Sequence, residues 1–542
     1  MRRFLVLIFF FGLGLAAEAR DFLIPLDDRP ANLLFVEQVY RIGEPREPLL
    51  TPPRKLLGRL YTPGDSDAVI DWLEERVKPG DTVFVSADMW LYGGLVASRT
   101  AAIDEGTVER RLQRLAEIGG NGVFVHVLAT VPRLALRTSD AQAPHEAKLS
   151  KWAKKSDLPP VPKLMEGARK GEPVPFPSGV PKEIVLEYLG VRDRNVATIG
   201  KLIELCELGY LDSLVLGQDD SNKTGLHRHE QRWINRRIEE HGVGGRATLI
   251  SGIDELSMVM VSGQLAERAG RAPVVRVVYS DPEAAAKVPP LESLPLKQMV
   301  EQHLKLAGAS VEDSETADLD LYVYVPYSKP WKVPGEERRP VSEAFVERVR
   351  DAMAGGRQVA VADLSLVNRM DPFLAESSLS ELSLPELEGF ASWNTPANTI
   401  GTVVSQAVCH QLAERSVSWT LNQRLESEKT HQAFLLARFI DDYAYQTVVR
   451  EQVRGQAKGL NSKAEPLLNL FGPVGLDIRL RLVEWARKTF DEHFLGRTFK
   501  MMPQGTMVRF ERSNLEVVLP WPRVFEVEAR LDLRLEPVSP EM

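Results

Sequence analysis

Cysteine is almost absent from this chain of 542 residues, which contains only Cys206 and Cys409. Two cysteines cannot build the disulfide framework that stabilises many secreted proteins, so the fold must depend on the burial of apolar surface. Aromatic residues make up only 7% of the chain, but apolar residues make up 44%, which is ample for large cores. At about 150 residues for each domain, the length predicts two to four domains.

Positive charge is also in short supply, because 75 acidic residues outnumber 67 basic residues and the net charge is -8. Nucleic acids and anionic membranes bind basic surfaces, so neither is expected as the main partner. We therefore expect a small-molecule or oligosaccharide substrate. The oligomeric state is not predicted.

Long apolar stretches are missing after the N-terminus. Arg2 and Arg3 precede an apolar segment at 4–15, and residues 17–19 (Ala-Glu-Ala) fit the small-x-small cleavage pattern of signal peptides. Residues 1–19 are therefore predicted to be a cleaved signal peptide, and the protein is predicted to be secreted or periplasmic. A transmembrane anchor is the alternative, but the apolar segment is shorter than the roughly 20 residues that span a bilayer, so no stable membrane insertion is expected.

Short apolar stretches alternate with longer amphipathic ones along most of the chain, which is typical of βαβ units around a parallel sheet. Strands are predicted at 22–26, 82–86, 123–128, 213–217, 248–251, 274–279, 319–325, 358–362 and 390–393. Apolar residues recur at spacings of three and four in the predicted helices, at 68–77, 107–118, 195–208, 230–240, 256–269, 296–306 and 342–354. The segment 141–181, rich in Pro, Lys and Glu, is predicted to be a long irregular insertion.

The predicted fold class is α/β, with parallel strands and flanking helices arranged either as a barrel or as two doubly wound lobes. Residues 20–270 are expected to form an N-terminal α/β domain with an acidic cleft at its strand ends. Residues 271–410 are expected to form a second α/β domain or the remaining strands of a barrel. Residues 411–542 are helical in pattern at 416–453 and 476–493 and alternate apolar with polar residues at 506–535, which predicts a mostly helical, β-ended C-terminal domain.

Acidic residues directly follow four of the predicted strands. These residues are Asp27, Asp28, Asp88, Asp219, Asp220, Asp254 and Glu255. Parallel strands present their carboxyl ends on one side of a sheet, where α/β folds bind ligands, so we expect these acids to line one shared cleft. Crowded carboxylates raise one another's pKa, so at least one of these acids should titrate well above its ordinary value.

Paired carboxylates at such an edge suit general acid and base catalysis, because neighbouring acids drive each other's pKa values apart. The candidate catalytic residues are therefore Asp219, Asp220, Asp254 and Glu255. The structural alternative for each pair is helix capping, since acidic residues are favoured at helix N-termini.

No metal ligand is assigned and no cofactor is expected, but a divalent metal is a second possibility. His227 and His229, with Glu230 beside them, lie just beyond the Asp219-Asp220 pair. Histidine and carboxylate side chains are common ligands of Zn²⁺, although histidines two positions apart on a helix point to different faces.

Several sequence motifs occur together in this chain. They are Pro25-Leu-Asp-Asp-Arg-Pro30, the segment 86–99 that begins Ser86-Ala-Asp-Met-Trp90, Gly217-Gln-Asp-Asp-Ser221, Gly252-Ile-Asp-Glu255 and Ser392-Trp-Asn-Thr-Pro-Ala-Asn398. Together they resemble a bacterial family known as domain of unknown function 4127, over nearly the whole mature chain. This chain has Ser392 and Ala397 where the family pattern has glycine, and it retains Asn394 and Asn398. The family name implies no activity.

The acid pairs also resemble, in motif shape, the pairs that end barrel strands in retaining N-acetylhexosaminidases. In those families one acid orients the acetamido group of the substrate, which acts as an internal nucleophile, while the other protonates the leaving oxygen. This resemblance implies an extracytoplasmic glycoside hydrolase, with N-acetylated amino sugars as candidate substrates. The alternatives are a metal-dependent hydrolase with Asp and His ligands and a non-catalytic periplasmic sugar-binding protein.

Polar and aromatic residues near the same strand ends are candidates for substrate binding, because sugars stack on aromatic rings and bond to amides and acids. The candidates are Asp27, Asp28, Arg29, Asp88, Tyr92, Arg99, Asn368, Trp393, Asn394 and Asn398. Trp90 and Trp331 are further candidate platforms. Arg29, Arg99 and Arg133 either clamp a carboxylate or phosphate or neutralise nearby acids, and the second role is expected for Arg29 beside Asp27 and Asp28.

Overall fold

A computed structural model describes residues 19–325, 335–459 and 471–538 of the chain. Residues 1–18 of the predicted signal peptide lie outside the described residues, as does Trp331. In the described part, no helix combines the length and the apolar composition that crossing a membrane requires.

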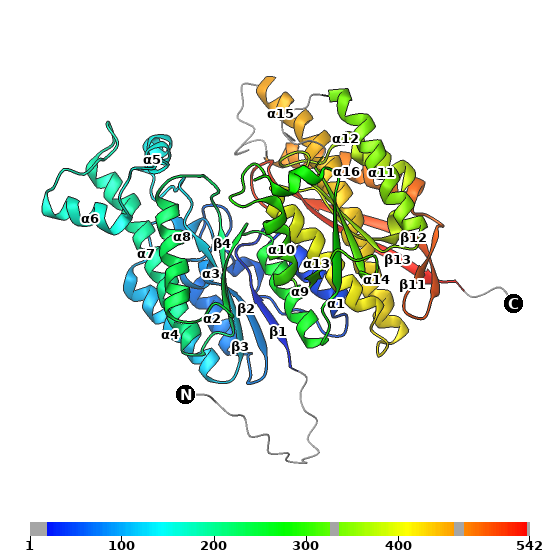
Figure 1. Cartoon of the computed structure of the whole chain (residues 1–542), viewed down its shortest axis with the longest axis horizontal. Helices are drawn as coiled ribbons and strands as arrows, with labels where there is room; N and C mark the ends of the chain where they lie inside the picture. Colours follow the sequence, from blue (N-terminus) through cyan, green and yellow to red (C-terminus); the bar gives the residue numbers. More distant parts are fainter. Residues whose placement is uncertain (1–18, 326–334, 460–470, 539–542) are drawn as a thin grey trace, which may run out of the picture.

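The first of two parallel five-stranded sheets has the strand order β1-β2-β3-β4-β5 (Figure 1). Its strands are β1 (Asp21–Ile24), β2 (Thr82–Ser86), β3 (Phe124–Val131), β4 (Ser213–Gln218) and β5 (Ala247–Ser251). One face packs against the outer helices α2 (Ser66–Glu74), α4 (Glu105–Gly120), α7 (Lys182–Glu207) and α8 (Leu226–Glu240). Both faces of the sheet are covered, which explains why its strands read as short apolar stretches and could be predicted.

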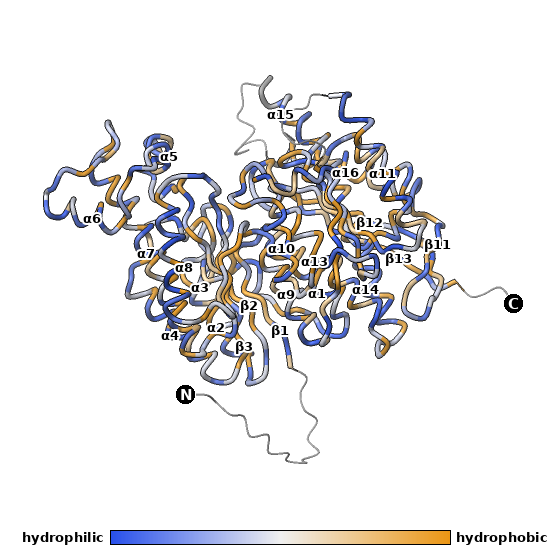
Figure 2. The backbone as a smooth tube through the Cα atoms, in the orientation of Figure 1, coloured by the Kyte–Doolittle hydropathy of each residue, from blue (hydrophilic) through white to orange (hydrophobic). Residues whose placement is uncertain are grey.

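The second sheet is also parallel, with the order β10-β9-β8-β6-β7. Its strands are β6 (Val274–Tyr279), β7 (Ser310–Val311), β8 (Leu319–Tyr324), β9 (Val359–Asp363) and β10 (Leu387–Ala391). Its outer face packs against α11 (Arg339–Ala354), α12 (Pro372–Glu381) and α14 (Leu421–Arg438). The strands β1, β2 and β3 of the first sheet are predominantly hydrophobic (Figure 2), and β8, β9 and β10 of the second sheet are fully buried. The α/β class with two wound sheets is therefore confirmed, and the barrel alternative is wrong.

A layer of helices lies between the two sheets (Figure 1). It consists of α1 (Leu34–Gly43), α9 (Leu256–Arg268), α10 (Leu296–Leu306) and α13 (Pro396–Glu414). The inner faces of both sheets share one hydrophobic core with this layer, in which Leu23 and Val215 come from the first sheet and Leu321 and Ala360 from the second. The common core fixes the carboxyl ends of the two sets of strands relative to each other.

The C-terminal region is helical and ends in an antiparallel sheet, as predicted. After α14 come a π-helical segment, η8 (Phe439–Val449), α15 (Arg450–Gly459) and α16 (Phe471–His493), followed by β11 (Thr498–Met501), β12 (Thr506–Val518) and β13 (Glu528–Pro537). Tyr445 of η8 donates a hydrogen bond to the carbonyl of Val524, at 2.9 Å. This contact anchors the β12–β13 connection to the helices.

The segment 141–181 is not the irregular insertion that its composition indicates. It forms α5 (Glu146–Ala153) and α6 (Val161–Lys170), which project from the molecule at upper left and pack on the beginning of α7 (Figure 1). Prolines precede or begin α6 and α7, where a missing N–H costs no helical hydrogen bond. The prolines therefore mark helix starts here.

The remaining elements are short. The helix α3 (Ala87–Tyr92) follows β2 directly. Single 3-10 turns occur at η1 (Arg54–Leu56), η2 (Ala97–Arg99), η3 (Ala143–His145), η4 (Pro282–Ala286), η6 (Gly335–Arg338) and η7 (Leu384–Glu386). Several of these turns lie in the connections that follow the carboxyl ends of strands, where they shape the loops around the site.

Candidate functional site

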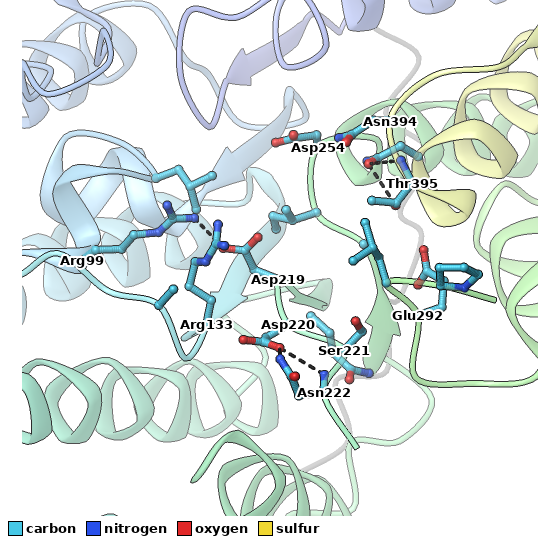
Figure 3. Close-up of a pocket in the computed structure, with 18 of the residues that line it drawn as sticks. Arg99, Arg133, Asp219, Asp220, Ser221, Asn222, Asp254, Glu292, Asn394 and Thr395 are labelled. Atoms are coloured by element: carbon cyan, nitrogen blue, oxygen red, sulfur yellow. Dashed lines mark hydrogen bonds and ion pairs between the residues drawn. The ribbon is translucent and has the colours of Figure 1, made fainter. Parts of the chain in front are cut away.

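A cavity of about 910 Å³ opens at the carboxyl ends of the strands (Figure 3). Every strand of the first sheet contributes a lining residue from the segment that follows it, including Arg29, Arg99, Arg133, Asp219 and Asp254. The second sheet contributes the connection at 288–292 and the start of α13, and the C-terminal region contributes Trp521, Arg523 and Phe525. The cavity thus lies where the two sheets and the C-terminal region meet.

Asp219 and Asp220 both line the cavity, immediately after β4. Arg99 pairs with Oδ2 of Asp219 at 2.5 Å. Asp220 accepts hydrogen bonds from the backbone N–H groups of Leu134 and Asn222, at 2.9 and 3.1 Å. Burial opposes ionisation of Asp220, but these donors hold its pKa below the usual value. Asp220 is therefore ionised near neutral pH, and neither acid caps helix α8, which begins after Gly225.

Asp254 lines the cavity after β5 and binds Arg29 through both carboxylate oxygens, at 2.8 and 3.0 Å. The same guanidinium binds Asp27, whose Oδ2 lies 2.8 Å from Nη2. Arg29 therefore neutralises Asp27, as its position in the sequence indicates, and Asp254 as well. Asp27 is buried behind Arg29 and does not line the cavity.

Glu255 points away from the cavity, contrary to its predicted pairing with Asp254. Its side chain is fully buried, and it accepts hydrogen bonds from His303, at 3.1 Å, and from the Asn398 amide. Gly401 on α13 approaches it so closely that an added Cβ would lie 2.3 Å from Cγ of Glu255. Glu255 and Asn398 thus join α9 to α13 behind the cavity wall, although Asn398 also lines the cavity.

Asp28 and Asp88 are also buried beside the cavity without lining it. Asp28 accepts a hydrogen bond from the indole of Trp521 at 2.6 Å, and Asp88 accepts one from the Thr130 hydroxyl at 2.7 Å. Burial raises the pKa of both carboxyls above the usual value, although these donors oppose the shift. Of the seven acids expected in one cleft, three line the cavity, namely Asp219, Asp220 and Asp254.

The aromatic residues proposed as sugar platforms are buried elsewhere. Trp90 lies in the core beneath the first sheet. The Tyr92 hydroxyl bonds to Thr198 at 3.0 Å, and Trp393 packs edge-on against Phe35. None of the three lines the cavity. Their sequence positions near strand ends could not distinguish core packing from exposure.

Asn394 and Asn368 are held together next to the cavity. The backbone N–H of Asn368 donates to the carbonyl of Asn394 at 2.8 Å, and both residues adopt φ of 62°. Asparagine tolerates this left-handed conformation better than most residues. Asn394 lines the cavity, whereas Asn368 supports it from behind.

Glu292 also lines the cavity, but the sequence patterns did not predict it as a site residue. Its Oε1 accepts a hydrogen bond from the backbone N–H of Ala397 at 2.9 Å. Burial, and to a smaller extent the charge of Glu255, raise the pKa of Glu292 to about 7. It follows Pro289-Pro290 in a loop between β6 and α10 rather than a strand, so the strand-end pattern gave no signal for it. The sequence also contained no pattern that pointed to the lining residues Trp521, Arg523 and Phe525.

The histidines considered as metal ligands do not converge. His227 contacts the carbonyl of Asn222 at 2.8 Å, His229 contacts the carbonyl of Leu158 at 3.0 Å, and Glu230 pairs with Arg192. Among the described residues, the His and acid groups close enough to share an ion lie elsewhere, around His410 between α13 and α14. One group consists of His410, Glu428 and His431. The other consists of Glu388, His410 and Glu414.

The cluster around His410 is a buried network of charges, and its two histidines cannot share one ion. His410 contacts Glu388 at 2.8 Å through Nδ1 and Glu428 at 3.2 Å through Nε2. Its ring stacks on that of His431, with centroids 3.6 Å apart and an interplanar angle of 8°. The lone pair of a ring nitrogen lies in the ring plane, so one ion cannot lie in both parallel planes.

A family model described as a protein of unknown function (DUF4127) matches residues 22–530. No curated protein and no solved structure matches the chain. The activity therefore has to be inferred from the residues of the cavity and their charges.

Proposed function

Because the chain belongs to this family, whose description states no activity, we propose from the site alone that it is a glycoside hydrolase that uses paired carboxylates. Glycosidic bonds are cleaved by one carboxyl group that protonates the leaving oxygen and a second that acts as a base or nucleophile. The observation that carries the proposal is the presence of a carboxyl with a pKa near neutrality, Glu292, in one cavity with ionised Asp220 and arginine-paired Asp219.

Glu292 is the proposed general acid. With a pKa of about 7, a large fraction of the group is protonated near neutral pH, so it can donate a proton to the departing oxygen. Its backbone donor Ala397 occupies one oxygen, Oε1. The side chain of Thr395 also hydrogen-bonds to this carboxyl and opposes the rise in its pKa.

Asp219 is the proposed second carboxylate. Arg99 donates to Oδ2 of Asp219, and among the described residues no hydrogen bond reaches Oδ1. Asp220 is a weaker candidate, since both of its oxygens already accept hydrogen bonds, from Leu134 at Oδ2 and Asn222 at Oδ1. We therefore assign Asp220 to holding the loops after β3 and β4 together.

Polar groups and a half-buried aromatic ring support a sugar as the substrate. Asn394, Ser221 and Asn222 offer neutral hydrogen-bonding groups to hydroxyl or acetamido groups. The half-buried ring of Phe525 lines the same cavity, with Arg523 over it at 5.3 Å from the ring centroid. A cavity of about 910 Å³ lies near the upper end of the usual range for ligand pockets, which leaves room for an oligosaccharide, including one with N-acetylated amino sugars. We also propose that the protein acts outside the cytoplasm, and N-terminal sequencing should place the mature start near Arg20.

Two alternatives follow from specific features of the cavity. A non-catalytic sugar-binding protein is favoured by the number of its charges that are already paired, such as Asp254 with Arg29. A metal-dependent hydrolase would have to use oxygen ligands, because the described lining contains no His or Cys. Loss of activity in a chelator, with recovery on addition of Mg²⁺ or Mn²⁺, would favour the metal hydrolase.

The experiment is to assay the purified protein on a panel of chromogenic glycosides, with N-acetylglucosaminides among them. Glu292→Gln should lower kcat by about 100-fold or more, the range expected for a lost general acid, while ligand affinity changes little. Glu283→Gln is the matched control, because Glu283 is exposed on η4 near the same loop. Equal activity of the two variants, or binding without hydrolysis of any glycoside, would contradict the proposal.

A further inference from the structure

Four arginines line the cavity, and three of them are paired with acids in the described part of the chain. Arg29 binds Asp27 and Asp254, as described above. Arg523 binds Glu526 at 2.5 Å, with its guanidinium 4.5 Å from the ring centroid of Trp521. Arg99 binds Asp219.

Arg133 is the exception. No acid among the described residues forms an ion pair with it, and its Nε is buried without a hydrogen-bond partner. Arg133 lines the cavity, so its guanidinium is open to an anionic ligand. The neighbouring Asp220 forms no ion pair with Arg133 in the described part of the chain, and its carboxylate accepts hydrogen bonds from Leu134 and Asn222.

The guanidinium of Arg133 lies in a group of like charges. Arg99 and Arg133 both extend toward Asp219 (Figure 3). Burial lowers the pKa of Arg99, Asp219 opposes this, and the charges of Arg133 and Arg29 lower it further. Arg99 and Arg133 thus lie close enough to repel each other, and of the two only Arg99 has an ion-pair partner among the described residues.

The position of Arg133 is fixed by its backbone. The fully buried Arg192 donates to the carbonyls of Arg133 and Pro132, at 2.5 and 3.0 Å, and its own charge is neutralised by Glu230. The ion pair between Arg192 of α7 and Glu230 of α8 thus holds the loop after β3 against these two helices. Arg133 is therefore presented to the cavity from a rigid support, which reduces the entropy cost of binding a ligand.

We infer that Arg99 and Arg133 form an anion-binding subsite, and that the sugar ligand carries a carboxylate or a phosphate. The planar fork of donors on a guanidinium matches the oxygens of both groups. The inference rests on the proposed function for the sugar, but the subsite itself depends only on the arginines. Arg192 acts as a positioning residue for Arg133.

Calorimetric titrations with inorganic phosphate, glucuronate, glucose 6-phosphate and glucose test the subsite. The wild-type protein should bind the anionic ligands at least about tenfold more tightly than glucose, and Arg133→Gln should weaken anion binding by about tenfold or more, as expected for a lost charge-assisted contact. Arg133→Lys should give an intermediate affinity, because it keeps the charge and loses the fork. The tighter of glucuronate and glucose 6-phosphate identifies the anionic group.

Arg236→Gln is the matched control, since Arg236 is exposed on α8 away from the cavity. Circular dichroism should show the Arg133 variants folded, because the Arg133 side chain makes no hydrogen bond to another described residue that the substitution would remove. Equal binding of glucose and the anions, or unchanged anion binding by Arg133→Gln, would overturn the subsite. Anion binding that persists in Glu292→Gln, with no hydrolysis by wild type, would instead overturn the proposed function alone.

Discussion

Arg29 and Asp254 are joined by two hydrogen bonds, at 2.8 and 3.0 Å, across 225 positions of the sequence. Arg29 follows β1 and Asp254 follows β5, and these are the two edge strands of the first sheet. The ion pair therefore closes the carboxyl end of an open sheet, with Asp27 as its third member. Both Arg29 and Asp254 line the cavity.

Replacing Arg29 with Met should destabilise the protein by about 3–5 kcal/mol, because Asp27 and Asp254 would be left near each other without a countercharge. Urea unfolding measures the difference. Arg236→Met, an exposed change on α8, should leave the midpoint nearly unaltered. Equal midpoints for the two variants would show that the closure adds little stability.

The rate of glycoside hydrolysis should fall as the pH rises through about 7, because the proposed acid Glu292 loses its proton there. A general acid works in its protonated form, so the rate falls as the proton is lost. The pH profile of kcat/KM reports this group in the free enzyme. A rate that rises through pH 7 would assign Glu292 as a base instead.

The stability of the protein should decrease as the pH rises above about 6.5 through the titration of His410. Burial opposes protonation, but Glu388 and Glu428 raise the pKa of His410 well above 6.5, so above that pH only the folded state keeps the proton. The contribution is therefore complete below 6.5 and is lost as the pH rises. Burial lowers the pKa of His431 to about 4, so that ring stays neutral in this window.

His410→Gln tests this pH dependence. At pH 6 the variant should be less stable than wild type by about 3–5 kcal/mol, since two buried carboxylates lose their partner. At pH 9 the difference should be smaller, as urea midpoints at the two pH values would show. A difference of the same size at both would mean that His410 is not charged in the folded protein.

Gly252→Ala should destabilise the protein and impair the site. Gly252 has φ of 93°, which costs other residues about 1–2 kcal/mol, and its new Cβ would lie 1.7 Å from Oε1 of Glu255. Gly190→Ala is the control, because Gly190 lies in helix α7 with no atom near the added Cβ and gains up to about 1 kcal/mol in helix propensity. Thermal unfolding should move in opposite directions in the two variants. A shift in the same direction would show that Glu255 can move aside.

The strands could be predicted from the sequence because each is a short apolar stretch covered on both faces. The helices of the central layer were harder to predict from the sequence. The periodicity of α9 and α10 was sufficient, but α13 is buried from Pro396 to Ala413 and has no polar face to reveal a helical period. Helix α1 is different, because Glu37, Gln38 and Arg41 lie off its buried face, so its helical period was present in the sequence and was overlooked.

The site was predicted in part. Asp219, Asp220 and Asp254 reach the cavity because the carboxyl ends of parallel strands define its position. The rule could not show that Glu255, one residue later, turns into the core toward His303. Glu292 reaches the cavity through long-range packing, which leaves no local pattern.

The hydrogen bond between Trp521 and Asp28 spans 493 positions, so it joins the segment after the first strand to one that is synthesised near the end of the chain. Trp521, Arg523 and Phe525 form part of the cavity wall, and they lie after all ten strands of the two parallel sheets. A ribosome builds the chain from the N-terminus, so the sheets and the central helices are synthesised first. The cavity can be completed only when the last hairpin has emerged and docked, and a nascent chain therefore lacks the complete cavity until synthesis is nearly finished.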